Sequence, residues 1–234
     1  MCDVCLQKGP SRRAMMFGAA GMLAATQFIG SAQAQLARAA GTPDEALKLL
    51  VAGNARYAAN KPQQRDFSAG RASRALGQKP FAAILGCADS RIAPELAFDQ
   101  GAGDLFVVRV AGNFMTPDGL GSVEYGAAVL GTKLIMVLGH HSCGAVNATI
   151  EALQKGNTLP GHIADLVRAI KPGIEPTLKQ PGSDLQARAV VANVKYNVER
   201  LKTATPILSD MVAKNQLGVV GGVYDITTGK VTLV

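Results

Sequence analysis

The sequence has 234 residues, of which 48% are hydrophobic and 18% are charged, so the chain can bury one sizeable core. This composition excludes collagen-like, coiled-coil and low-complexity proteins. Its 24 basic and 17 acidic residues give a net charge of +7, but the basic residues are scattered and only 5% of the chain is aromatic. A nucleic-acid groove needs a basic stripe with stacking rings, so we expect no nucleic-acid partner.

The first 34 residues are expected to direct export. Basic residues, among them Arg12 and Arg13, precede an uncharged apolar run over residues 14–30, and the small residues Ala32 and Ala34 follow it. This order is typical of a secretory signal peptide, and the run is short for a membrane span of about 20 residues. We therefore expect residues 1–34 to be removed, leaving no stable membrane anchor and one domain over residues 35–234.

Residues 11–15 (SRRAM) resemble the twin-arginine export signal, although methionine stands where phenylalanine is more common. The resemblance favours a periplasmic or secreted protein exported by the twin-arginine route, with the general secretory route as the alternative. Cys2 and Cys5 lie upstream of the expected cleavage site. The mature protein is therefore expected to keep two cysteines, Cys87 and Cys143.

The mature chain is predicted to begin with a helix at Thr42. Thr42 is a suitable N-cap, Pro43 suits the first helical position, and Glu45 completes a capping box. Residues 61–79 are polar and rich in turn-forming residues, and they are predicted to form a connection.

The rest of the chain alternates between predicted strands and helices. Short apolar runs typical of buried parallel strands occur at residues 81–86, 105–110, 134–139 and 217–223. Helices are predicted between them over residues 119–130, 144–153, 162–170 and 184–201. This alternation predicts an α/β domain with a mainly parallel central sheet flanked by helices, and the turn at residues 227–229 predicts an antiparallel C-terminal edge strand.

Three soft or borderline metal donors follow two of these strands. Cys87 ends the first strand, while His140 and Cys143 follow the third. Ligands bind beyond the carboxyl ends of strands in open α/β sheets, and two thiols with one imidazole suit tetrahedral zinc with one open position. The alternative is a pair of buried free cysteines. A serine hydrolase is disfavoured because the sequence has no G-x-S-x-G motif.

The motif Cys87-x-Asp89-x-Arg91 followed by His140-x-x-Cys143 resembles the signature of the β-class carbonic anhydrases. Intervening segments at residues 98–101, 104–109, 111–113 and 124–125 are similar as well, so the resemblance covers nearly all of residues 42–234. It implies a zinc enzyme that reversibly hydrates carbon dioxide to bicarbonate and a proton.

The resemblance also implies roles for individual residues. Cys87, His140 and Cys143 would hold Zn²⁺, and Asp89 would either take the fourth position or release it to water. Arg91 would hold the Asp89 carboxylate through two hydrogen bonds, so both residues are expected to be catalytic.

Three further positions match the plant-like subgroup of the family. Gln78 matches a glutamine that binds the substrate oxygen, and Phe106 and Tyr125 match residues that line the substrate pocket. His141 remains a possible proton shuttle, although neighbouring strand-end residues point to opposite sides and favour His140 as the ligand.

The resemblance implies a homodimer or a higher even oligomer. Two other functions stay open: a zinc hydrolase of carbon disulfide or a related analogue on the same scaffold, and a non-catalytic zinc- or bicarbonate-binding protein. The pairing of Asp89 with Arg91 argues against the second, because zinc binding alone does not require it.

Overall fold

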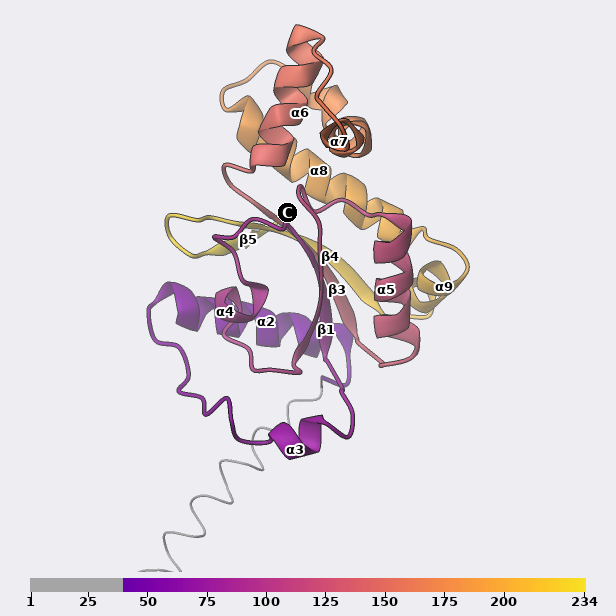
Figure 1. The fold of residues 1–234 in the computed structure, drawn as a ribbon. Helices are drawn as coiled ribbons and strands as arrows, with labels where there is room; N and C mark the ends of the chain where they lie inside the picture. Colours follow the sequence, from indigo (N-terminus) through magenta and orange to yellow (C-terminus); the bar gives the residue numbers. More distant parts are fainter. Residues whose placement is uncertain (1–39) are drawn as a thin grey trace, which may run out of the picture. The chain divides into compact units, whose positions relative to one another are not determined.

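A computed structural model describes residues 40–234 of the chain (Figure 1). The predicted signal peptide over residues 1–34 lies outside the described residues. Within residues 40–234, no helix is both long and apolar enough to cross a membrane.

A five-stranded sheet forms the centre of the described domain, with the strand order β2-β1-β3-β4-β5. The first four strands are parallel, and β5 pairs with β4 in the antiparallel direction. The sheet consists of β1 (Ala82–Gly86), β2 (Leu105–Arg109), β3 (Leu134–His140), β4 (Gly218–Tyr224) and β5 (Val231–Leu233). The predicted α/β fold with a mainly parallel sheet and an antiparallel C-terminal edge strand is therefore confirmed.

Helices cover both faces of the sheet, as Figure 1 shows for α2 and α4 on one side and α5 and α8 on the other. The helices are α2 (Pro43–Ala58), α3 (Arg71–Arg74), α4 (Pro94–Ala97), α5 (Pro117–Ala128), α6 (Gly144–Lys155), α7 (Ile163–Leu178), α8 (Leu185–Lys202) and α9 (Ile207–Ala213). The helix predicted to begin after Thr42 is present with its capping box.

Because both faces are covered, β1 and β3 are buried along their whole length. Alternate residues of a strand point to opposite faces, and β1 follows this rule. Ala83 and Leu85 pack in the core that includes residues of α5, α6, α7 and α8, whereas Ala82 and Ile84 pack in the core that includes residues of α2.

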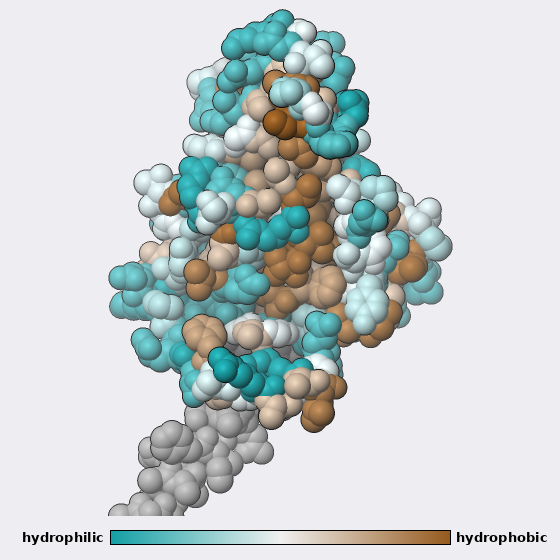
Figure 2. Space-filling model, in the orientation of Figure 1, coloured by the Kyte–Doolittle hydropathy of each residue, from teal (hydrophilic) through white to brown (hydrophobic). Residues whose placement is uncertain are grey.

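The edge strand β2 differs from the two central strands. Its residues Leu105 to Val108 are only half-buried. Figure 2 shows an apolar band along this face, between α4 and α5. Tyr125 on α5, whose ring lies 6.4 Å from that of Phe106 in β2, is 48% exposed, and Leu96 on α4 is 61% exposed.

The helix α7 is longer than the sequence predicts and continues through Pro172 and Pro176 to Leu178. A proline inside a helix loses a backbone hydrogen bond and costs about 3 kcal/mol. Packing offsets this cost: Ile170 and Ile174 are fully buried in the core. Gly173 also permits a close approach of α8, since a Cβ at this position would lie 3.1 Å from the Tyr196 side chain.

Candidate metal centre

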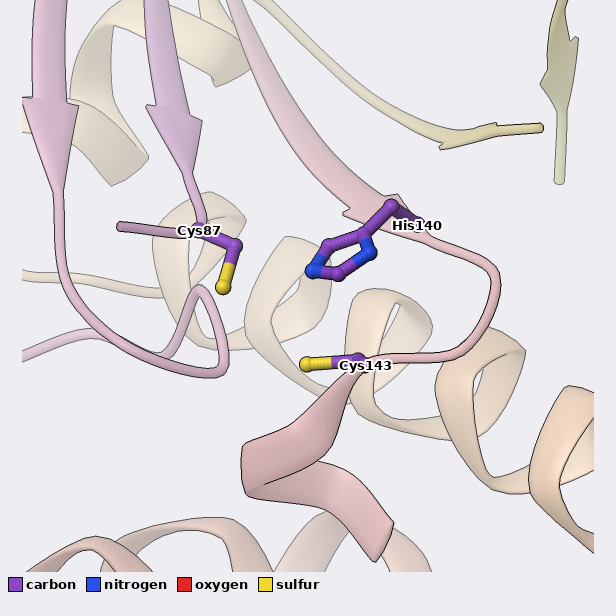
Figure 3. Close-up of side chains that lie close together, drawn as sticks. All are labelled: Cys87, His140 and Cys143. Carbon is purple, nitrogen blue, oxygen red and sulfur yellow. The ribbon is translucent and has the colours of Figure 1, made fainter. Parts of the chain in front are cut away.

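Cys87, His140 and Cys143 meet at the carboxyl edge of the sheet (Figure 3). Cys87 directly follows β1, His140 is the last residue of β3, and the two strands are hydrogen-bonded neighbours. Cys143 is the residue before the first turn of α6. The three ligand atoms all lie within 4.8 Å of one another, and among residues 40–234 no other cluster of His, Cys, Asp and Glu has this geometry.

The ring of His140 is oriented as a metal ligand. Its Nδ1 lies 2.9 Å from the backbone oxygen of His141, which can only accept, so Nδ1 carries the proton. The other ring nitrogen, Nε2, is buried and has no hydrogen-bond partner in the described protein. A buried acceptor without a partner costs roughly 1–3 kcal/mol, and a metal ion between Nε2 and the two sulfurs would satisfy it.

The two thiols influence each other's ionisation. The Cys143 thiol donates a hydrogen bond to Cys87, which lowers the pKa of Cys87 and raises that of Cys143. One proton therefore leaves easily and the second is retained. A divalent cation that binds both sulfurs as thiolates must displace the proton that Cys143 retains, so metal binding is coupled to proton release at this site.

A backbone amide supports Cys87 from the loop after β2. The N–H of Gly112 donates to the Cys87 sulfur over 3.3 Å. Gly112 has a φ of +86°, and a Cβ there would come within 2.5 Å of Ile170, so only glycine fits. The carbonyl of Gly112 accepts a hydrogen bond of 2.8 Å from the buried Asn193 on α8. These supporting contacts could not be predicted from the sequence, because they join segments far apart in the chain.

Asp89 and Arg91 form the bidentate pair that the sequence predicts. Nε of Arg91 donates to Oδ1 over 2.9 Å and Nη2 donates to Oδ2 over 2.7 Å. The backbone N–H of Arg91 also donates to Oδ1 over 2.9 Å. These hydrogen bonds hold the pKa of the Asp89 carboxyl well below its usual range, so the carboxylate is an acceptor at any physiological pH.

The carboxylate of Asp89 also faces the three donors. Its Oδ2 lies 3.8 Å from Nε2 of His140, while Nη2 of Arg91 lies within 3.4 Å of the backbone oxygen of Ser142. The pair therefore lies at the edge of the cluster. A group bound between the donors would be in reach of an acceptor whose orientation is fixed by Arg91.

His141 points away from the donors. Its backbone N–H donates to the carbonyl of Tyr224 over 2.9 Å, and its side chain is half-exposed with Nδ1 4.0 Å from Oδ1 of Asp225. The alternation expected at the strand end is therefore observed, and His140 is the histidine of the cluster.

The three residues expected to contact substrate are not near this cluster within one chain. Gln78 is exposed and precedes β1, whereas Cys87 follows it. Phe106 is paired in register with Ala83. At roughly 3.3 Å per residue, Phe106 is displaced from the level of Cys87 by about 13 Å along the sheet. The ring of Tyr125 lies 6.4 Å from that of Phe106. Their roles in substrate binding stay predictions.

Known proteins share this arrangement of sequence and fold. The carbonic anhydrase family model matches residues 82–231. Carbonic anhydrase 2 of Mycobacterium tuberculosis is 41% identical over 192 residues, which cover 82% of this chain and 92% of that protein. The carbonic anhydrase of Mycolicibacterium smegmatis is 39% identical, covering 82% of this chain and 93% of that protein.

Solved structures show the same fold. The Coccomyxa β-carbonic anhydrase in complex with acetazolamide has a TM-score of 0.64 and 28% identity, covering 71% of this chain and 77% of that one. A tetrameric β-carbonic anhydrase of the filamentous ascomycete Sordaria macrospora has a TM-score of 0.63 and 24% identity, covering 70% of this chain and 86% of that one.

The family match, the shared fold and the cluster of Cys87, His140 and Cys143 agree with one another. The chain therefore belongs to the β-carbonic anhydrase family, and its activity is that of a carbonate dehydratase, a lyase that interconverts carbon dioxide and bicarbonate.

Proposed function

We propose that this chain performs carbon dioxide hydration at a zinc ion held by Cys87, His140 and Cys143. The observation that supports this proposal most strongly is the buried, unpartnered Nε2 of His140, which lies close to two free thiols and beside a fixed carboxylate. A site that only stored zinc would need the three donors. It would not need the Asp89 carboxylate held at their edge by Arg91.

Zinc, when bound, supplies a Lewis acid that makes a water molecule acidic enough to act as a nucleophile. The chain supplies the orientation. Asp89 accepts a hydrogen bond from the attacking water and so directs a lone pair of its oxygen at the carbon of carbon dioxide. Arg91 keeps the carboxylate ionised and in place through its two parallel hydrogen bonds.

We also propose that the working unit is a homodimer, or a higher even oligomer, built across β2. An edge strand presents unpaired backbone groups, and here it lies in an apolar band (Figure 2). A two-fold axis perpendicular to β2 would place the amino half of one strand against the carboxyl end of its partner. Phe106 and Tyr125 of one subunit would then approach the donors of the other.

This arrangement would give Gln78, Phe106 and Tyr125 the substrate-binding roles expected from the plant-like subgroup. Each is exposed or half-buried in the single chain, and so each is available to a partner. The tetrameric relative from Sordaria macrospora has the same fold, which is consistent with an even assembly.

The export proposal rests on the amino-terminal sequence pattern. We expect cleavage after Ala34, a mature chain that begins at Gln35, and a periplasmic or secreted location reached by the twin-arginine route. Amino-terminal sequencing of the protein from its native host tests the cleavage. Replacing both Arg12 and Arg13 by lysine tests the route, because precursor should then accumulate in the cytoplasm.

A direct substrate comparison tests the enzyme proposal. The purified protein over residues 35–234, loaded with zinc, should hydrate carbon dioxide rapidly and hydrolyse carbon disulfide slowly or not at all. The reverse ranking would identify a hydrolase of the sulfur analogue. Zinc binding without turnover of either substrate would identify a non-catalytic binding protein.

A further inference from the structure

Arg109, the last residue of β2, reaches across to the turn that follows β1. Its Nε donates to the carbonyl of Cys87 over 2.8 Å. Its Nη2 donates to the carbonyl of Asp89 over 2.7 Å and to that of Ile92 over 2.8 Å. One guanidinium group therefore binds three backbone oxygens within a segment of six residues.

These three carbonyls bracket the side chain of Asp89. One belongs to the ligand Cys87 on its amino side, one to Asp89 itself, and one to Ile92 on its carboxyl side. Within the turn, the backbone contributes a weaker restraint, a hydrogen bond of 3.2 Å from the N–H of Ile92 to the carbonyl of Asp89. Arg109 therefore supplies an external restraint on both flanks of the carboxylate.

The contacts of Arg109 differ from those of Arg91. Arg91 binds the carboxylate side chain, whereas none of the ion pairs found in residues 40–234 includes Arg109. Its donors are directed at backbone carbonyls by a planar fork, which the single nitrogen of a lysine cannot reproduce. The geometry therefore fits a group that fixes the shape of the turn.

We propose that Arg109 is a positioning residue that sets the direction of the Asp89 carboxylate relative to Arg91 and the metal donors. This inference rests on the catalytic role proposed for Asp89. Catalytic groups work when held to within about 0.5 Å, and a displacement near 1 Å can cost about 100-fold in rate. Arg109 acts through Asp89 and does not itself touch the reacting atoms.

A double-mutant cycle tests this action through Asp89. In the parental background, Arg109→Gln should lower kcat for carbon dioxide hydration by about 10- to 100-fold with little change in KM and with zinc retained. In the Asp89→Asn background, the same change should cost less than about threefold, because the carboxylate that Arg109 positions is already lost. Equal losses in the two backgrounds would overturn the proposal, as would parental activity in Arg109→Gln.

The absorption spectrum of the cobalt-substituted protein gives a readout that does not depend on activity. Arg109→Gln should shift the visible bands of Co²⁺ when Asp89 is present and leave them unshifted in Asp89→Asn. If the parental protein binds metal but hydrates no carbon dioxide, the proposed function fails. The positioning role is then judged by this spectral difference alone, and unshifted bands in both backgrounds would overturn it.

Two further variants make the test independent of general effects on folding. Arg109→Lys keeps the charge and much of the side chain but not the planar fork, so it should show most of the fall in kcat expected for Arg109→Gln. If Arg109→Gln does not fold, Arg109→Lys replaces it in the double-mutant cycle with Asp89→Asn. Arg168→Gln is the matched control, because the Arg168 side chain is 72% exposed and pairs with Asp165 on α7. Both residues are far in sequence from the turn over residues 87–92. It should keep the parental kcat and the parental cobalt spectrum, and a kcat in Arg109→Lys equal to that of this control would contradict the proposal.

Discussion

Oδ2 of Asp89 lies 3.8 Å from Nε2 of His140, so the carboxylate and the imidazole face the same small volume. The two groups come from the ends of neighbouring strands and are separated by 51 positions in the sequence. Arg91 holds the same oxygen of the carboxylate through a hydrogen bond of 2.7 Å from Nη2. The arrangement places a fixed hydrogen-bond acceptor next to a buried metal donor.

Cys143→Ser should remove most of the bound zinc. A neutral hydroxyl is a poor replacement for a thiolate, and Cys143 is buried. Metal analysis of the purified protein should fall from about one zinc per chain to a small fraction of that value. Ser142→Ala is the control and should keep its zinc, because Ser142 is not one of the three donors of the cluster. Full zinc occupancy in folded Cys143→Ser would remove Cys143 from the ligand set.

Asp89→Asn and Arg91→Ala should each keep zinc and lose about 100-fold or more in carbon dioxide hydration, the scale usual for one positioned catalytic group. The amide of asparagine is a weaker acceptor and can present an N–H where an oxygen is needed. Loss of Arg91 removes the two bonds that hold the carboxylate in place. Stopped-flow hydration on zinc-loaded protein measures both effects. Near-parental rates in both variants would contradict the proposed role of the pair, and loss of zinc from Asp89→Asn would make Asp89 mainly a ligand.

Much of the fold could be predicted from the sequence because its signals are local. The four apolar runs predict β1 to β4 to within one residue or so, since strands buried on both faces contain few polar residues. The capping box at Thr42 and Glu45 predicts the start of α2. The short helices α3, α4 and α9 were not predicted, because seven residues or fewer show too little periodicity. The helix α3 lies within residues 61–79, which were predicted to form only a connection. The end of α7 was missed because core packing outweighs the effect of Pro172 and Pro176.

The donors of the site could be predicted for a different reason. Cys87, His140 and Cys143 lie at or just after the carboxyl ends of strands that meet at one edge of a parallel sheet, so topology alone brings them together. The support from Gly112 and Asn193 could not be predicted, because it depends on how the β2 loop and α8 meet in three dimensions. The positions of Phe106 and Tyr125 relative to the donors also depend on tertiary structure, and the substrate contact proposed for them would need a second subunit.

Asp99→Asn should reduce stability, and the reduction should disappear in acid. Burial would raise the pKa of this carboxyl, but hydrogen bonds from Arg65 and Arg56 outweigh it and hold the pKa below its usual value. A lowered pKa in the folded state adds stability above the unfolded pKa near 3.8, and this stability is lost as pH falls through the folded value. Removing one partner of a buried ion pair costs about 3–5 kcal/mol in the free energy of unfolding, so we expect a loss of this size for Asp99→Asn at pH 7.

Urea unfolding of parental protein and Asp99→Asn at several pH values between 7 and about 2 measures this effect. The two unfolding free energies should converge as pH falls. Asp210→Asn is the control, because Asp210 pairs only with the exposed Lys214 on the surface, and it should change stability by less than about 1 kcal/mol. A constant difference between parental protein and Asp99→Asn across this range would contradict the assignment.

Two inactive variants should restore activity to each other if substrate-binding residues come from a partner subunit. Asp89→Asn lacks the acceptor but keeps Gln78, whereas Gln78→Ala keeps the acceptor. In a mixed dimer, one site combines the intact Asp89 of one chain with the intact Gln78 of the other. Random co-assembly should therefore restore about a quarter of the parental hydration, since half of the dimers are mixed and each has one intact site. Activity equal to the mean of the separately purified variants would place Gln78 outside the partner's site.

The dependence of hydration on zinc occupancy decides whether a zinc ion held by Cys87, His140 and Cys143 is catalytic. The purified protein over residues 35–234 is stripped of metal with a chelator and titrated with Zn²⁺ while stopped-flow hydration of carbon dioxide is recorded. We expect the hydration rate to rise in proportion to added zinc, to stop rising at about one zinc per chain, and to remain at background in Cys143→Ser. A metal-free protein that hydrates carbon dioxide at the full rate, or a fully loaded one that does not hydrate it, would rule out catalysis by zinc at this site.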